Sequence, residues 1–261
     1  MTWRGAGDPA RRANLDTVLR WLGLLRPAEI IVVEQDVAPS LTGLSATPGL
    51  RVVFAYNPGP FNKSWGFNVG VRMSGGSVLA FGDADVVCGS LPAAVMQCRA
   101  GSPVVRAFRG INDLTEAESD MLRGDLSCIS DPTFVRRPPD RAAVGELPPV
   151  CGALVLFRRE FFMLLGGWDE RFLGWGGEDN AMDIKVQRAQ IQPAIMNTSD
   201  GFHLHHARAN TDIAKSPDYR NNLALLEQLR SLSEEALRRS CEVASQLMGN
   251  PEMHRPMERL P

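Results

Sequence analysis

The sequence has no apolar run near the roughly 20 residues that a membrane-spanning helix needs. Its N-terminus also lacks the pattern of a secretory signal peptide. We therefore expect no membrane span and a soluble protein of the cytoplasm. With 261 residues, 44% of them hydrophobic, the chain can bury the core of one sizeable domain, so disorder over most of its length is not expected.

No Cys-x-x-Cys pair is present, and the five cysteines are an odd number, which argues against a disulfide framework. We expect ordinary buried thiols. No basic patch is present either: the formal net charge is −2, and the basic residues are mostly arginines spread along the chain. A nucleic-acid partner is therefore not expected, and a small-molecule or glycan partner is favoured.

Apolar patterns in the first hundred residues predict an α/β fold. Residues 14–25 have helical spacing, with Asn14 or Asp16 able to cap the helix. Residues 28–36 form a continuous apolar run that ends in acids, which is typical of a strand buried on both faces of a parallel sheet. Further strands are predicted at 50–56 and 77–87, with a short helix over 64–75 between them. This alternation predicts right-handed crossovers in a mostly parallel sheet.

The second half of the sequence is less regular. Residues 101–149, rich in prolines and charges, are predicted to be long loops with a little helix. A strand at 153–157 and a helix at 159–165 follow. Residues 218–248 have a helical pattern with one apolar stripe of leucines, Leu223, Leu226, Leu229 and Leu232. The last dozen residues are expected to be frayed.

The "FGDADVV" stretch contains two carboxylates, Asp83 and Asp85. If the strand stays extended, residues i and i+2 point to the same side, so both carboxylates would lie together at its carboxyl end, where open α/β sheets bind ligands. Paired hard oxygen ligands suit Mg²⁺ or Mn²⁺, which can hold a diphosphate. The alternative is an acidic turn that merely ends a strand.

The stretch "GWDERFLGWGGEDNAMDIKVQR" combines aromatics, glycines and acids. Trp168 and Trp175 have flat faces that stack on sugar rings. Gly174, Gly176 and Gly177 permit unusual backbone angles and close approach to a ligand.

The acids of the same stretch lie at a predicted helix start. There the helix dipole favours ionised carboxylates on Glu178 and Asp179, and Asp183 shares the face of Asp179. The alternative is that the acids only cap the helix and that the tryptophans fill the core.

Two further groups are candidates for ligand binding. His203, His205 and His206 are three of the four histidines, and His203 and His205 share a side if the segment is extended. An exposed polar loop is the alternative, and no HExxH motif supports a zinc hydrolase. In "FNKSWGFNVGV", Lys63 could neutralise phosphate charge and Asn68 could meet a ligand at the helix start, or the lysine could be incidental.

Together these motifs resemble the GT-A glycosyltransferases. "GGWDERFLGWGGEDN" resembles the C-terminal signature shared by β-1,4-galactosyltransferases, polypeptide N-acetylgalactosaminyltransferases and bacterial family 2 enzymes such as chondroitin polymerases. "EIIVVEQD" resembles the nucleotide-binding strand, "NKSWGFNVGV" the helix before the metal motif, and "DAD" the DxD motif. The resemblance covers roughly residues 8–208.

The resemblance implies an inverting, metal-dependent transfer of a hexose or N-acetylhexosamine from a nucleoside diphosphate sugar, with a UDP-sugar favoured. The acceptor would be a hydroxyl of a glycan, a lipid-linked glycan or a small molecule. It further implies a domain over 1–217, with a nucleotide-sugar and metal half at 1–100 and an acceptor and base half at 101–217, followed by a helical extension at 218–261. The oligomeric state stays open.

The resemblance also implies residue roles. Asp179, or else Glu178, would be the catalytic base. Asp85 and His203 would hold Mn²⁺ or Mg²⁺, with Asp83 and His205 as further candidates, and the choice among the three clustered histidines stays open. The remaining candidates are Glu34, Asp36, Lys63, Asn68, Asp83 and Arg4 for the donor, and Trp168, Trp175, Gly176, Gly177, Asn180 and Asp183 for the sugar or acceptor.

The sequence departs from vertebrate galactosyltransferases in ways that leave the acceptor unassigned. Asn180 stands where those enzymes continue with aspartate, and neither a membrane anchor nor secretory disulfides are visible, which favours a bacterial cytoplasmic branch. Two alternatives remain. The basic, glycine-containing stretch from Arg4 to Arg12 loosely resembles the phosphate loop of a nucleotidyltransferase. A non-catalytic glycan-binding module with the same fold is the other.

Overall fold

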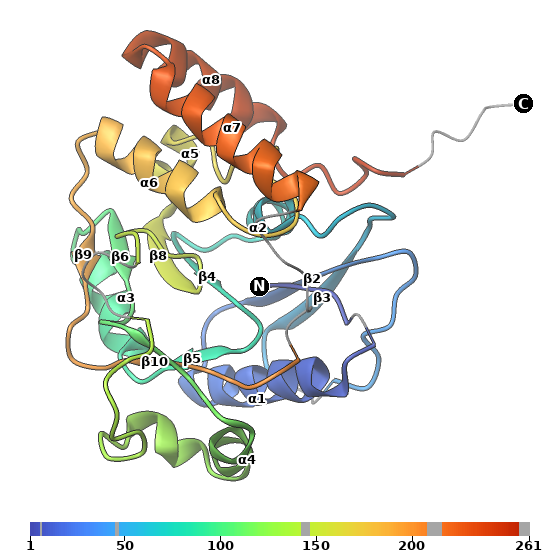
Figure 1. Ribbon diagram of the computed structural model, residues 1–261, viewed down its shortest axis with the longest axis vertical. Coiled ribbons are helices and arrows are strands. Elements are labelled where there is room, and N and C mark those ends of the chain that lie inside the picture. Colours follow the sequence, from blue (N-terminus) through green and yellow to red (C-terminus); the bar gives the residue numbers. More distant parts are fainter. Residues whose placement is uncertain (6, 45–46, 142–146, 208–215, 256–261) are drawn as a thin grey trace, which may run out of the picture.

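The computed structural model describes residues 1–5, 7–44, 47–141, 147–207 and 216–255, and Figure 1 shows how its elements are arranged. The strands are β1 (Thr2–Trp3), β2 (Ile30–Asp36), β3 (Leu50–Tyr56), β4 (Val78–Gly82), β5 (Val86–Cys88), β6 (Val104–Arg106), β7 (Ile111–Asp113), β8 (Leu154–Arg158), β9 (Ala194–Ile195) and β10 (Gly201–His203). The helices are α1 (Pro9–Leu25), α2 (Lys63–Arg72), α3 (Leu91–Arg99), α4 (Glu116–Gly124), the 3₁₀ turn η1 (Leu126–Ser130), α5 (Arg159–Leu164), α6 (Glu178–Arg188), α7 (Pro217–Ser231) and α8 (Glu234–Leu247).

The described strands form three sheets, and only one of them is parallel throughout. β1, β2 and β3 are parallel, in that order. The order β4-β8-β6-β9 is antiparallel except for β6 with β9, and in β5-β10-β7 the β10 strand is antiparallel to β5 and parallel to β7. The α/β class is confirmed, and four of the seven described strand pairs are parallel as expected, while β8 runs antiparallel to β4 and β6, and β5 to β10.

The first half of the chain follows the predicted order of elements. β2 and β3 pair along seven residues, from Ile30 opposite Leu50 to Asp36 opposite Tyr56. The predicted cap of α1 is wrong: Asp8 caps the helix by accepting a hydrogen bond from the Ala10 backbone, with Pro9 at the first turn. Asn14 is instead buried within the helix, and its amide donates to the backbone oxygens of Leu204 and His205.

A buried polar network fixes the start of α2 against the parallel sheet. The Gln35 amide nitrogen donates to the Thr2 hydroxyl and to the Asn62 carbonyl, and its oxygen accepts from Asn57 and from the Asn62 backbone. The Asn62 side chain caps α2 by accepting from the Trp65 backbone. This network sets the position of Lys63, the first residue of α2.

The region predicted to be mainly loop contains regular elements. Residues 101–141 include β6, β7, α4 and η1, and a capping box between Thr115 and Glu118 defines the start of α4. The prediction failed because short strands held by neighbours distant in sequence carry little local signal. Residues 142–146 of that stretch lie outside the described residues.

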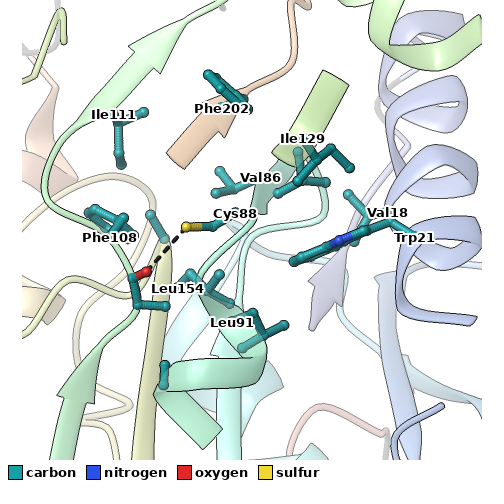
Figure 2. Close-up of a cluster of buried hydrophobic side chains, with 14 of the residues drawn as sticks. Val18, Trp21, Val86, Cys88, Leu91, Phe108, Ile111, Ile129, Leu154 and Phe202 are labelled. Atoms are coloured by element: carbon teal, nitrogen blue, oxygen red, sulfur yellow. Dashed lines mark hydrogen bonds between the residues drawn. The ribbon is translucent and has the colours of Figure 1, made fainter. Parts of the chain in front are cut away.

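The largest core cluster lies beneath β5 and β10. Figure 2 shows Val18 and Trp21 of α1 meeting Val86 and Cys88 of β5, together with Phe202 of β10. The Cys88 thiol donates to the backbone oxygen of Ala107 at 3.1 Å. All five cysteines, which lie within the described ranges, are free thiols as expected. This core holds the end of β10 beside the start of β5, which is where the candidate site is found.

The C-terminal helices pack with α5 and α6 at one end of the molecule, opposite α4 (Figure 1). Leu226 and Leu229 of α7 share a core cluster with Phe172 and Ala181. Two details of the predicted tail are wrong: the helix is broken between α7 and α8, and Leu223 is 47% exposed. Residues 250–255 are also not frayed, because the Trp65 indole donates to the Asn250 carbonyl; residues 256–261 lie outside the described residues.

Candidate active site

The Asp83–Ala84–Asp85 segment is a turn that links two sheets. β4 ends at Gly82 and β5 begins at Val86, so the chain is not extended through the two aspartates. The Asp83 backbone donates to Ala153 beside β8, and the Asp85 carbonyl accepts from Leu204 after β10. The prediction that both carboxylates point to one side of a strand is therefore wrong, and they reach different partners.

The carboxylate cluster, as we call it, consists of Asp83, Glu178 and Asp179 around Lys63. The Lys63 ammonium lies 2.8 Å from the Asp83 carboxylate and 3.9 Å from that of Glu178. Glu178 and Asp179 begin α6, as the sequence predicted. Burial alone would lower the pKa of Lys63, but Asp83, Asp179 and Glu178 outweigh it and raise that pKa above its ordinary value.

Asp179 has a perturbed acidity. Burial raises its pKa from 3.8 to about 7, the acids Glu178 and Asp83 add to the rise, and Lys63 and a hydrogen bond from the Gly152 backbone oppose it. The sequence predicted that the helix terminus favours the ionised carboxylate; burial opposes that ionisation here. The group titrates near neutral pH, which is the range that suits a general base.

Two glycines allow Asp179 to take this position. Gly177 precedes α6 with a φ of +98°, and a β-carbon there would lie 2.8 Å from the Phe172 ring. A β-carbon on Gly152 would lie 2.6 Å from Asp179 Oδ1, where the Gly152 N–H now donates at 2.9 Å. Gly176 also has positive φ, at +90°. The unusual backbone angles predicted for Gly174, Gly176 and Gly177 are therefore observed.

The histidine cluster consists of Asp85, His203 and His206. One possible metal-ligating atom from each lies within 4.8 Å of the others. His203 Nε2 is 3.7 Å from Asp85 Oδ1, and His206 Nε2 is 3.3 Å from Asp85 Oδ2. Burial opposes ionisation of Asp85, but His206 and His203 outweigh it and lower its pKa, and hydrogen bonding to Asp85 raises the pKa of His206.

Asp83 and His205 do not join the histidine cluster. The Asp83 carboxylate pairs with Lys63 instead, and the His205 side chain is exposed while its backbone is held by Ser119 and Asn14. The shared side was predicted for an extended segment, but β10 ends at His203, so the strand does not continue to His205. Both rings still line a pocket of about 260 Å³ together with Asp113.

The two tryptophans of the glycine-rich stretch have opposite environments. Trp168 is 1% exposed and packs on Phe67 and Phe81 in the core, so its predicted sugar stacking is wrong. Trp175 is 64% exposed and lies beside Tyr219 of α7, with ring centroids 5.9 Å apart. Trp175 thus remains a surface on which a sugar ring could stack.

Several predicted donor residues have structural partners. Asn68 is fully buried and its amide exchanges hydrogen bonds with the Trp168 backbone. Glu34 is 1% exposed, and its Oε1 accepts from the Ser40 backbone and hydroxyl and from the Leu41 backbone. Because both side chains are buried and hydrogen-bonded within the protein, neither can make the predicted contact with the donor.

Arg4 and Asp36 lie together at the carboxyl end of β2. The Arg4 guanidinium donates to the carbonyls of Gln35, Asn57 and Gly59, so it fastens loop backbone. This use of Arg4 weakens the comparison of residues 4–12 with a nucleotidyltransferase phosphate loop. Asp36 is half-buried and accepts from the Val37 backbone.

The remaining predicted acceptor residues lie on α6. Asn180 is exposed, directly after the carboxylate cluster. Asp183 is 8% exposed, and its Oδ2 accepts from Gln187, while burial raises its pKa.

Asn222, which supports the glycine-rich stretch, was not among the residues predicted for the site. This buried residue of α7 donates to the carbonyls of Leu173 and Gly176, each at 2.8 Å. An asparagine on the helix face that also carries Leu226 and Leu229 was the only signal that could have shown it. His206 was visible in the histidine group but could not be chosen over its neighbours before the contact of its Nε2 with Asp85 was known.

One segment of the chain matches a known protein family. Residues 145–207, which contain α6, β10 and the two histidines of the cluster, match a family described as the N-terminal domain of galactosyltransferase. No curated protein sequence matches the chain. No helix in the described ranges is long and apolar enough to cross a membrane.

Solved structures with a similar fold share little sequence with the chain. A mannosyltransferase from Pyrobaculum calidifontis, in complex with GDP-Man and Mn²⁺, aligns with a TM-score of 0.51 and 15% identity over 94% of this chain and 71% of that chain. A mycobacterial protein aligns with a TM-score of 0.51 and 17% identity over 84% and 71% of the two chains. The catalytic domain of a Drosophila β1,4-galactosyltransferase 7, in complex with xylobiose, aligns at 0.49 and 14% over 89% and 79%. The chain has the GT-A glycosyltransferase fold. That fold and the matched galactosyltransferase segment together support the assignment of the chain as a glycosyltransferase.

Proposed function

We propose that the protein transfers a hexose or N-acetylhexosamine from a nucleoside diphosphate sugar to a hydroxyl acceptor, with inversion at the anomeric carbon. One observation carries the proposal: the turn at residues 83–85 sends two aspartates into two different clusters. Asp83 pairs with Lys63 beside Asp179, and Asp85 contacts His203 and His206. A candidate base and a candidate metal site are thereby held at opposite ends of one three-residue turn.

The histidine cluster fits a divalent transition metal. Two imidazole nitrogens and one carboxylate suit Mn²⁺ better than Mg²⁺, which prefers oxygen ligands. We therefore propose Asp85, His203 and His206 as the protein ligands of Mn²⁺. When bound, the ion would stabilise the negative charge on the diphosphate leaving group. The mannosyltransferase of similar fold was solved with GDP-Man and Mn²⁺, which supports a donor of this class, although a UDP-sugar remains our preference for this chain.

Asp179 is the proposed base. Its Oδ1 is held by the Gly152 N–H, so the carboxylate is oriented before an acceptor arrives. As the acceptor oxygen forms its bond to the anomeric carbon and the bond to the diphosphate breaks, the hydroxyl proton passes to this carboxylate. A single base with attack opposite the leaving group gives inversion. The Lys63 ammonium pairs with Asp83 beside the base and is the cation that we propose for a phosphate of the donor.

The glycine-rich stretch is the proposed acceptor side. Trp175 offers an exposed aromatic face, and Asn180 lies one residue beyond the proposed base. Asn222 holds the backbone of this stretch from α7. In this proposal residues 1–100 and the clustered histidines bind the donor and metal, residues 101–217 supply the base and acceptor side, and residues 218–261 support them.

A cytoplasmic location of the protein stays a prediction.

The first experiment is a thermal-shift panel of UDP-, GDP- and dTDP-sugars, each with Mn²⁺ and with EDTA. A ligand that binds only the folded state raises the melting temperature. We expect one nucleotide family to stabilise the wild type only with Mn²⁺, and Asp85→Ala to lose that response. The absence of any nucleotide response in the presence of Mn²⁺ would contradict the proposal and favour a non-catalytic module of the same fold.

A further inference from the structure

His203 has a different carboxylate at each ring nitrogen. Nε2 lies 3.7 Å from Asp85 Oδ1, on the side of the histidine cluster. Nδ1 lies 3.0 Å from Oδ1 of Asp113, which is within hydrogen-bonding distance. A neutral imidazole carries one proton and can bind a metal ion only through its other nitrogen, so whichever group holds the proton decides which nitrogen is available.

The sheet fixes Asp113 in this place. Asp113 and His203 are the last residues of β7 and β10 and are Cα partners in their parallel register, so their side chains leave the sheet as neighbours. The backbone of Asp113 is tied on both sides, because its N–H donates to Asp140 and its carbonyl accepts from Arg137. These two hydrogen bonds hold the Asp113 backbone in place beside His203.

Arg141 contacts the same carboxylate oxygen of Asp113 as His203 does. Its Nη2 lies 2.6 Å from Asp113 Oδ1, and the Arg141 backbone forms a bridge with Ile111 at the start of β7. A charge-assisted contact of this kind orients the aspartate. A continuous series of contacts thus runs from Arg141 through Asp113 to His203.

We propose that Asp113 is a positioning residue that keeps the proton of His203 on Nδ1 and thereby directs Nε2 toward the metal site. The inference about the metal rests on the proposed function, but the inference about the proton does not. A carboxylate behind a metal-binding imidazole fixes the ring and makes its free nitrogen a better ligand. Residues 131–141 thus contribute to the site through Asp113, although none of them belongs to the histidine cluster.

Three variants test the role of Asp113. Asp113→Ala removes the acceptor, and Asp113→Asn keeps an oxygen that can accept from Nδ1–H but removes the charge. Asp200→Ala is the matched control, because Asp200 also pairs with an arginine, Arg109, and borders β10, but it has no contact with His203 among the described residues.

The first readout needs no metal. Nitrogen-15 NMR of the imidazoles in the metal-free protein, recorded at a pH where the spectra show a single proton on the ring, reports which nitrogen carries that proton. We expect His203 of the wild type and of Asp200→Ala to carry it on Nδ1. In Asp113→Ala the proton should move toward Nε2, the usual site in water, and Asp113→Asn should largely restore Nδ1. An Nε2 proton in the wild type, or no change in Asp113→Ala, would overturn the proposal.

The second readout is Mn²⁺ affinity, measured from the electron paramagnetic resonance signal of the free ion. We expect Asp113→Ala to weaken binding by about 10- to 100-fold, the range for outer partners of metal ligands, with a smaller loss in Asp113→Asn. Equal losses in Asp113→Ala and Asp200→Ala would mean general destabilisation and would overturn the positioning role. A wild type that carries the Nδ1 proton but binds no Mn²⁺ would contradict the metal part of the proposed function and the affinity part of this inference, and leave the proton assignment standing.

Discussion

The two clusters at the ends of the residue 83–85 turn shift carboxylate acidity in opposite directions. In the carboxylate cluster three acids surround one ammonium, and burial raises the pKa of Asp179 to about 7. In the histidine cluster one acid faces two imidazoles, which overcome burial and lower the pKa of Asp85. Burial raises both pKa values: at Asp85 the two imidazoles outweigh it, whereas at Asp179 the single Lys63 ammonium does not, and Glu178 and Asp83 add to the rise.

This difference separates two chemical tasks. An acid that titrates near neutral pH can accept and release a proton, whereas an acid that stays ionised can hold a cation. If the two clusters divide the chemistry in this way, changes in one should affect proton transfer, and changes in the other should affect metal binding. Substitutions on either side test that separation, and the largest effect is expected at the proposed base.

Asp179→Asn should lower the rate of sugar transfer by roughly 10²- to 10⁴-fold, the contribution of a positioned general base. Mn²⁺ affinity should not change, because the substitution leaves the histidine cluster intact. Rates of nucleoside diphosphate release with acceptor present, combined with Mn²⁺ titration, measure both. Near-normal turnover in this variant would show that the base is another residue, with Glu178 the next candidate.

His206→Ala should weaken Mn²⁺ binding by at least about 10-fold, since losing a ligand should cost no less than losing an outer partner. His205→Ala is the matched control: its ring is exposed and outside the histidine cluster, so its affinity should equal that of the wild type. Isothermal titration with Mn²⁺ distinguishes them. A larger loss of Mn²⁺ affinity in His205→Ala than in His206→Ala would instead support the metal role first predicted for His205.

Lys63→Met should move the acidic limb of the pH–rate profile upward from about pH 7. Lys63 lowers the pKa of Asp179, so without the ammonium the base stays protonated to higher pH. For each pH unit that the limb moves, the ionised fraction of Asp179 below its pKa falls about tenfold, so the loss should be largest on the acidic side and recover as pH rises. An equal loss at every pH would assign Lys63 to donor binding alone.

The smallest expected effect is on thermal stability and has opposite signs in the two clusters. The pKa of Asp179 is raised on folding, so its contribution to stability is present below about pH 4 and is lost as pH rises through about 7. Asp179→Asn removes the buried charge and should raise the melting temperature more at pH 8 than at pH 5, by about 2–4 °C per kcal/mol.

Asp85→Asn should show the reverse. Because the pKa of Asp85 is lowered on folding, its contribution is present above its unfolded pKa and is lost as pH falls. Removing that charge should lower the melting temperature at neutral pH. Scanning calorimetry across pH measures the change in melting temperature for both variants. A change in the same direction in both would show that the two clusters do not differ electrostatically as described.

The sequence could predict the elements whose signals are local. β3 has the predicted bounds, and α2 and α6 begin within one residue of the expected positions, because hydrophobic period and helix-start acids act over a few residues. The strands β6 and β7 within residues 101–141, and also β10, were not predicted, since each is three residues long and exists through its partners.

The lack of long-range information in a sequence pattern also explains why some candidate residues were identified correctly and others were not. Asp179, Glu178, Lys63, Asp85 and His203 were each found by their type and spacing, and the fold brings them into the two clusters. Trp168 and Asn68 have the same character in the sequence as ligand-binding residues, yet they pack against each other in the interior. Composition cannot distinguish a tryptophan that binds sugar from one that fills a core, because both need a large flat apolar surface.

By itself the sequence determined the α/β class, the helix start at Glu178 and the supply of acids and histidines, because these depend on short-range pattern and residue chemistry. Only the tertiary structure decided how those groups were divided. The break between β4 and β5 sent Asp83 and Asp85 to different partners, and the register of β7 with β10 placed Asp113 behind His203. Hydrogen-bond register and chain reversal depend on contacts between distant segments, so no local pattern could specify them.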